Sequence, residues 1–149
     1  IIVLLVGTNN RNQTANQVLD GIKEIVELIA KKQTQASILV LKIPPRGQHP
    51  NPKRVLLMEI NDGLKETLSN VPNCYVLDID PGFVKFLAID QSITNLNIIH
   101  AHHHGITDGT INHRDMYDYL HFTSQGYRRA FEIVHSTVMS LLYPENTVT

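Results

Sequence analysis

Blocks of apolar residues alternate with mixed blocks along the chain, and their periods predict strands and helices in turn. Residues 1–6 and 37–43 are continuous runs rich in Ile, Val and Leu, typical of strands covered on both faces of a parallel sheet. Residues 74–79 predict a third strand of the same kind. Glycine, proline or aspartate follows each run and ends it.

Three amphipathic segments lie after these runs and predict helices. The first begins at Thr14, where Gln17 completes a capping box. The second covers residues 55–68, with a candidate interruption at residues 61–63, and the third covers residues 124–142. The expected apolar faces are Val18, Leu19, Ile22, Ile25, Val26 and Ile29 in the first helix and Tyr127, Phe131, Val134, Val138 and Leu141 in the third.

Strands that alternate with helices predict an α/β fold, with a parallel sheet and helices on both of its faces. No linker rich in Gly, Pro and Ser divides the chain, so residues 1–149 are expected to form a single domain. Such sheets bind ligands at the carboxyl ends of their strands, where Asn9, Arg46 and Asp80 are placed. The stretch before the last helix can reach the same edge.

Composition and charge narrow the classes of function. The formal net charge of -1 gives no electrostatic case for binding nucleic acid or an anionic membrane surface. No apolar run approaches the roughly 20 residues of a membrane span, and the first residues do not read as a signal peptide. The single cysteine, Cys74, cannot form an internal disulfide, which fits a reducing compartment and predicts a cytoplasmic protein.

The stretch from Asp118 to His121 is the first candidate for chemistry. A carboxylate and an imidazole three residues apart fall on one side of a helical turn. The carboxylate can then accept the Nδ1 proton and leave Nε2 free as a base, which is two thirds of a hydrolase triad. Spacing alone leaves open that His121 packs the helix start and that Asp118 and Asn9 are turn residues.

Four motifs occur in a fixed order. They are Gly7-Thr8-Asn9-Asn10, residues 41–48 (LKIPPRGQ), residues 80–84 (DPGFV), and residues 108–121 with Asp108-Gly109-Thr110 at their start. Together they resemble the catalytic subunits of the intracellular platelet-activating factor acetylhydrolase of type Ib, within the SGNH (GDSL) hydrolase family. The resemblance runs over residues 1–84 and about 107–142, and it implies a flavodoxin-like three-layer α/β/α fold.

The resemblance implies a role for each site residue. Asn9 matches the asparagine whose amide donates into the oxyanion hole, and Asp118 and His121 match the triad acid and base. The implied reaction is a cofactor-free removal of the sn-2 acetyl group from platelet-activating factor or a similar ester. A fixed amide donor suits the tetrahedral oxyanion of that reaction.

The departures from the family are as informative as the match. Family members begin with a strand that ends in Gly-Asp-Ser and carries the nucleophile, followed by a block whose glycine completes the oxyanion hole; this sequence has neither. None of its serines has that context. They are Ser37, Ser69, Ser92, Ser124, Ser136 and Ser140.

Three hypotheses follow from this departure. The favoured one is a C-terminal part of a longer serine esterase, because the sequence starts without Met inside an expected strand, so that the domain is partial and lacks its first strands. This chain alone is then expected to be inactive. The second is a catalytically inactive homologue that acts as a dimerising scaffold or regulator. The third is an α/β domain in which Asp118 and His121 are structural.

Two further features carry predictions. An insert at about residues 85–106 contains His100, His102, His103 and His104, which could bind Zn²⁺ or Ni²⁺, but a surface loop without metal is favoured because no cysteine and few carboxylates lie near. Arg46 is either an exposed charge or a residue of the acyl pocket or of a subunit contact. The resemblance also suggests a homodimer or heterodimer and a WD-repeat regulatory subunit of the lissencephaly type.

Overall fold

A parallel three-stranded sheet forms the centre of the molecule, as the sequence predicts. The computed structural model describes residues 1–10, 12–85 and 109–144. The strands β1 (Ile2–Leu4), β2 (Ile38–Leu41) and β3 (Cys74–Leu77) lie in the order β1-β2-β3, with Ile38 of β2 paired with Ile2 and with Cys74. Two short strands, β4 (Val84–Lys85) and β5 (Thr110–Ile111), pair antiparallel in a separate sheet.

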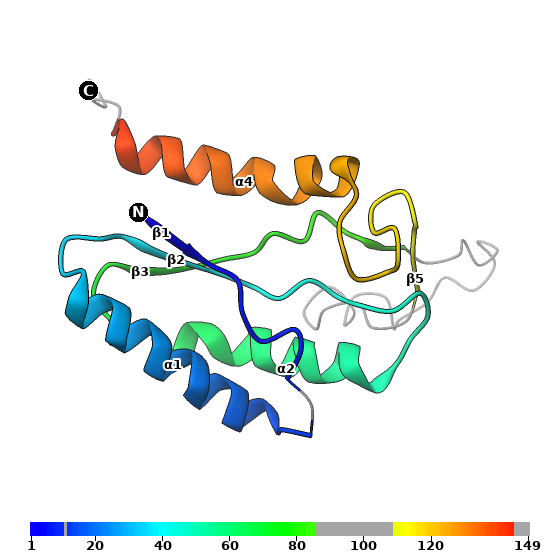
Figure 1. Cartoon of the computed structure of the whole chain (residues 1–149), viewed down its shortest axis with the longest axis horizontal. Helices are drawn as coiled ribbons and strands as arrows, with labels where there is room; N and C mark the ends of the chain where they lie inside the picture. Colours follow the sequence, from blue (N-terminus) through cyan, green and yellow to red (C-terminus); the bar gives the residue numbers. More distant parts are fainter. Residues whose placement is uncertain (11, 86–108, 145–149) are drawn as a thin grey trace, which may run out of the picture.

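Helices cover both faces of the sheet and complete three layers. The helices α1 (Ala15–Lys32) and α2 (Pro52–Thr67) lie on one face, and α4 (Ser124–Leu142) lies on the other (Figure 1). The capping box predicted at Thr14 is present at the start of α1. The carboxyl ends of the strands point toward the side of the molecule where the loop before α4 lies (Figure 1). The α/β/α prediction is confirmed.

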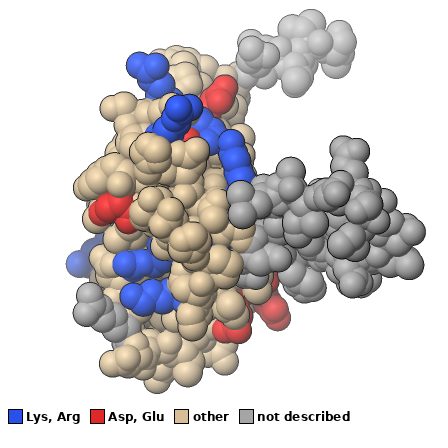
Figure 2. All heavy atoms as spheres, turned by 90° about the vertical axis from the view of Figure 1, so that its right-hand side faces the viewer, with Lys and Arg blue, Asp and Glu red and all other residues tan. Residues whose placement is uncertain are grey.

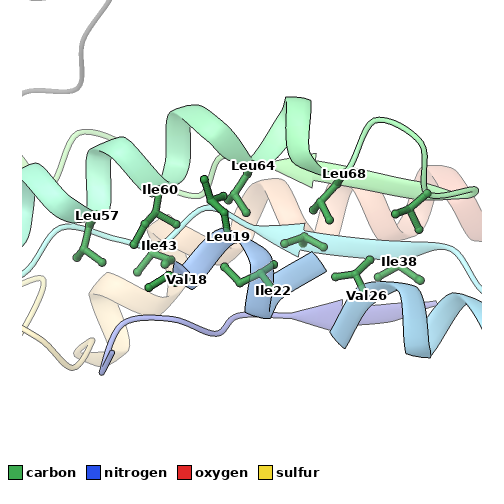
Figure 3. Packing of buried hydrophobic residues seen from close by; sticks show 12 residues of the cluster. Val18, Leu19, Ile22, Val26, Ile38, Ile43, Leu57, Ile60, Leu64 and Leu68 are labelled. Atoms are coloured by element: carbon green, nitrogen blue, oxygen red, sulfur yellow. The ribbon is translucent and has the colours of Figure 1, made fainter. Parts of the chain in front are cut away.

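Two apolar clusters hold the layers together. The first joins α1 and α2 to the sheet, with Val18 and Ile22 of α1 beside Ile60 and Leu64 of α2 (Figure 3). The second joins α4 to β2 and to the loops at the carboxyl edge. It contains Leu41, Ile79, Phe83, Val84, Ile111, Met116, Ala130 and Val134. Because Met116 belongs to this cluster, the loop that carries Asp118 is fixed to the core at its start.

The first strand is covered on one face, which corrects the prediction that it is buried on both. Leu4 and Val6 pack on the cluster beneath α1 and α2, whereas Val3 and Leu5 are 42% and 39% exposed. The reason is that α4 packs over β2 and β3 and, among the described elements, none covers this side of β1. An apolar edge strand with an open face is the kind of surface that proteins normally cover.

The second helix runs through residues 61–63, so the predicted interruption is wrong. Asn61 turns its side chain toward the end of β2, where its Oδ1 accepts from the Ile43 N–H (2.7 Å) and its Nδ2 donates to the Ile43 carbonyl (2.9 Å). At Gly63 an added Cβ would lie 2.5 Å from Cδ1 of Leu19. The asparagine and the glycine therefore serve tertiary packing and not a helix break.

Two residues of the predicted apolar faces are exposed to a large extent. Ile25 on α1 is 43% exposed and Tyr127 on α4 is 53% exposed. In α4 the buried positions are Gly126, Ala130 and Val134, of which Val134 belongs to the predicted face. Small residues are needed there because a Cβ at position 126 would overlap the carbonyl oxygen of Asp115. The helix therefore contacts the candidate site loop directly.

Candidate active site

Asp118 and His121 lie in a closed loop and not in a helical turn, which corrects the predicted local geometry. Met116 and Phe122 form an antiparallel bridge at its base, and the Tyr117 N–H donates to the His121 carbonyl oxygen (3.1 Å). Tyr119, at the tip, has a φ of +60°, a conformation that side-chain-bearing residues rarely adopt. This reversal of the chain turns the two site residues toward each other.

The acid and the imidazole form the hydrogen bond that the sequence predicts. Oδ2 of Asp118 lies 2.6 Å from Nδ1 of His121. Oδ1 of Asp118 accepts the N–H groups of Leu120 (3.1 Å) and His121 (2.7 Å), which fixes the carboxylate in the loop. The His121 ring also stacks on Tyr117, with ring centroids 5.8 Å apart. Both partners remain open, with the imidazole side chain 61% and the carboxylate 41% exposed.

The contacts of Asp118 lower its pKa to about 2. The His121 N–H makes the largest contribution, followed by the His121 imidazole, and the loss of hydration acts in the opposite direction. An ionised carboxylate can only accept hydrogen bonds, so Nδ1 of His121 carries the proton of the shared bond. In the neutral ring Nε2 then holds the free lone pair and can act as a base.

This lowered pKa predicts how stability changes with pH. The pKa of an aspartate is about 3.9 in an unfolded chain. When folding lowers this pKa, the ionised carboxylate stabilises the fold at pH values above the unfolded-state pKa. This stabilisation is lost as the pH falls through the folded-state pKa. We therefore expect the wild-type chain to lose this contribution between about pH 4 and 2, and Asp118→Asn to lack it throughout. Unfolding free energies against pH and the Asp118 ¹³Cγ shift measure this. A carbon resonance titrating near its ordinary value would contradict it.

Asn9 follows β1 in a turn and reaches the same region through Arg46. The turn starts at Gly7, whose φ of +104° and close approach to Ile43 exclude a side chain (an added Cβ would lie 2.7 Å from Cδ1). Nη1 of Arg46 donates to the Thr8 carbonyl oxygen (2.7 Å) and to Oδ1 of Asn9 (3.2 Å). Arg46 is thus half-buried and bound to the turn that carries Asn9, and its predicted place in an acyl pocket or a subunit contact stays a prediction.

The segment 46–48 joins Asn9 to the loop between Met116 and Phe122, here called the acid–imidazole loop because it carries Asp118 and His121. On the far side of Arg46, the Gly47 N–H donates to the Tyr119 carbonyl oxygen (2.7 Å). The structure therefore brings Asp118 and His121 into direct contact and places Asn9 across one short segment from them. In the described part of the chain no hydrogen bond joins Asn9 to His121 itself.

A buried cation, Arg54, holds segment 46–48 in place. Arg54 is 2% exposed and donates to the carbonyl oxygens of Gly47 (2.6 Å) and Gly109 (2.7 Å), among others, and the loss of hydration lowers its pKa. Asn51 caps α2 and donates to the Arg46 carbonyl oxygen (2.9 Å). Sequence analysis missed both residues. Asn51 before Pro52 is a recognisable helix start and could have been found.

Two grooves lie beside these residues. One of about 610 Å³ runs between residues 46–53 and Asp118, Tyr119 and Leu120. A much smaller hollow lies beside Thr8 and Asn9. Residues Arg46 and Lys53 line both. Of the candidate residues, Asn9 therefore lines the smaller hollow and Asp118 the larger groove, whereas His121 lines neither of the two.

Asp80 does not take part in this arrangement. Its Oδ1 accepts the N–H groups of Gly82 (2.8 Å) and Phe83 (2.7 Å), and burial raises its pKa despite these bonds. The predicted position at a strand end is right, but the carboxylate stabilises the turn after β3.

The predicted metal site can be compared with the described part of the structure. Within residues 1–10, 12–85 and 109–144 no group of three or more His, Cys, Asp or Glu could hold a metal ion. Residues 100–104 lie outside the described residues, so the choice between metal site and surface loop stays a prediction.

Figure 2 shows Lys and Arg in separate groups on the face it presents, with Asp and Glu among them, and not in one positive band. None of the described helices combines the length and apolarity of a membrane span.

The layers and the parallel sheet define a three-layer α/β/α protein, with the acid–imidazole loop at the carboxyl edge of its sheet. A solved structure from Streptococcus pneumonia, provisionally described as a platelet activating factor, has this fold with a TM-score of 0.64 at 17% identity, covering 92% of this chain and 58% of that one. No protein-family model matches the chain.

Sequence comparison identifies its relatives. The chain is 42% identical over 142 residues to the platelet-activating factor acetylhydrolase IB subunit alpha1 of Rattus norvegicus and of Homo sapiens, covering 95% of this chain and 52% of each relative. Identity to the alpha2 subunit of Gallus gallus is 39% over 142 residues. The chain is a homologue of the platelet-activating factor acetylhydrolase IB subunits. It spans about half the length of these relatives.

Proposed function

We propose that this chain supplies the acid, the base and one oxyanion donor for the hydrolysis of a short-chain carboxylic ester. The observation that carries the proposal is the 2.6 Å contact between Oδ2 of Asp118 and Nδ1 of His121, whose side chain is 61% exposed. His121 takes the proton of an attacking hydroxyl and returns it to the leaving alcohol, and Asp118 holds the tautomer. Asn9 donates to the oxyanion.

The attacking hydroxyl comes from outside the described residues. On α4, the hydroxyl of Ser136 donates to the Glu132 carbonyl oxygen (3.0 Å) and that of Ser140 to the Thr137 carbonyl oxygen (2.9 Å), both within the helix. None of the described serines forms a hydrogen bond with His121. A serine outside residues 1–149, in the half of the relatives that this chain does not span, fits the acyl-enzyme route. The substrate class is an sn-2 acetyl phospholipid of the platelet-activating factor type.

A second candidate function is that of a catalytically inactive homologue that serves as a dimerising scaffold or regulator. The exposed apolar residues favour it, because Val3 on β1, Leu5 directly after β1, and Leu142 and Tyr143 at the end of α4 would be covered in an assembly. A cytoplasmic location, a catalytic-subunit dimer and a WD-repeat partner belong to both candidates. Light scattering on the full-length protein measures the oligomeric state, and the esterase assay separates the two candidates.

The esterase proposal is tested by acetate release from a short-chain ester by the full-length protein and by its Asn9→Ala variant. Removing one oxyanion donor is expected to lower kcat by about 10²–10³-fold with a small change in KM, because the donor acts on charge that develops in the transition state. A full-length protein without acetate release would contradict the proposal. An Asn9→Ala variant with wild-type kcat would remove Asn9 from the mechanism.

A further inference from the structure

Arg46 is the cation that bonds directly to the candidate oxyanion donor. Its Nη1 lies 3.2 Å from Oδ1 of Asn9 and 2.7 Å from the Thr8 carbonyl oxygen. We propose that Arg46 is a positioning residue that fixes the Asn9 amide with Nδ2 directed to the reacting ester. This inference rests on the proposed esterase function and deepens it, because it names the group that orients the donor.

The chemistry of the guanidinium decides which way the amide faces. A guanidinium has only N–H donors, so the amide atom that faces it must be the oxygen. The Nδ2 group, which is the useful donor for an oxyanion, therefore lies on the opposite side of the amide. Within the described residues it donates to no protein acceptor. With Arg46 removed, both orientations of an exposed amide become accessible, and one of them turns the acceptor toward the oxyanion.

Arg46 can act in this way because it is itself held in place. It is half-buried, and its carbonyl oxygen accepts from Nδ2 of Asn51 (2.9 Å) and Nε of Arg54 (3.2 Å). The next residue, Gly47, bonds to Tyr119 in the acid–imidazole loop. A donor that is oriented before the reaction needs no rearrangement as the oxyanion forms. The same segment thus bonds to the turn that carries Asn9, the proposed donor, and to the loop that carries His121, the proposed base.

Lys53 offers a matched control in the same place. It lines both grooves together with Arg46, is exposed, and carries the same charge. Its described hydrogen bond is made by its backbone N–H to Asn51 and not by its ammonium group. Replacement of Lys53 by Met therefore removes a nearby positive charge and leaves the Arg46–Asn9 contact in place.

The orientation of the amide is tested by NMR on the chain itself. We expect Arg46→Met to shift the two Nδ2 proton resonances of Asn9 and to reduce the NOEs that define one orientation. Lys53→Met should leave both unchanged, and Arg46→Lys should restore part of the wild-type pattern. The proposal is overturned if Arg46→Met leaves the Asn9 resonances unchanged in a folded protein, or if Lys53→Met shifts them equally.

The catalytic consequence is tested with a double-mutant cycle in the full-length protein. Arg46→Met is expected to lower kcat roughly 10-fold with little change in KM, because only the orientation of a transition-state donor is lost. In an Asn9→Ala background the same replacement should have no further effect on kcat. An equal loss of kcat in both backgrounds would show that Arg46 acts without Asn9 and would overturn the proposal.

The two measurements separate this proposal from the proposed function. If the full-length protein does not release acetate, the esterase proposal fails, and the catalytic role of Arg46 fails with it, whereas the NMR result still decides whether Arg46 orients the amide. If acetate is released and the cycle shows no coupling, the esterase proposal stands and the positioning role of Arg46 is wrong.

Discussion

Replacing His121 by alanine is expected to abolish acetate release by the full-length protein, with a loss in kcat of about 10⁶-fold, the magnitude seen when a triad base is removed. The expectation rests on the 2.6 Å contact between His121, the proposed base, and Asp118. Asp118→Asn should cost about 10⁴-fold, since an amide in place of the carboxylate favours the wrong tautomer of the ring.

His135 provides the matched control for this prediction. It is another exposed histidine, on α4, outside the residues that line the two grooves. His135→Ala should keep kcat within a few-fold of the wild-type value and keep the same KM. Hydrolysis that survives His121→Ala at wild-type rate would show that Asp118 and His121 form a structural pair, which is the third hypothesis from the sequence.

The acid–imidazole contact could be predicted from the sequence because it is local. Asp118 and His121 are three residues apart, and short polar side chains at that spacing meet in several backbone conformations. The conformation itself could not be predicted. It depends on the positive φ of Tyr119 and on the pairing of Met116 with Phe122 over a buried cluster, and these are tertiary effects.

The contacts that assemble the rest of the site are distant in sequence. Arg46 and Asn9 are 37 residues apart, and Arg54 reaches Gly109 across 55 residues. An arginine in the first turn of a helix normally reads as a surface residue, so no local pattern marks Arg54 as buried. The alternation of strands and helices predicts that these segments lie at the carboxyl edge of the sheet. Which side-chain donor bonds to which backbone acceptor is shown only by the folded structure.

A second large effect is expected at the ion pair that fixes the acid–imidazole loop to α4. Nη1 of Arg129 lies 2.7 Å from Oδ2 of Asp115, whose side chain is 4% exposed. Arg129 also lies over the Phe83 ring, at 5.4 Å from its centroid. The backbone oxygen of Asp115 accepts from the N–H of Thr123, the N-cap of α4 (2.9 Å). Asp115 therefore bonds to α4 through its main chain at Thr123 and through its side chain at Arg129.

Arg129→Met is expected to lower the free energy of unfolding by about 3–5 kcal/mol, because it leaves a buried carboxylate without its partner. Asp115→Asn should cost less, about 1–3 kcal/mol, because the 30% exposed guanidinium side chain can turn to water. The double variant should be more stable than the sum of the two losses implies. Urea unfolding of the chain measures all three, with Arg128→Met, a neighbouring exposed arginine, as the control. Equal effects of Arg129→Met and Arg128→Met would show that the ion pair does not stabilise the junction between α4 and the loop.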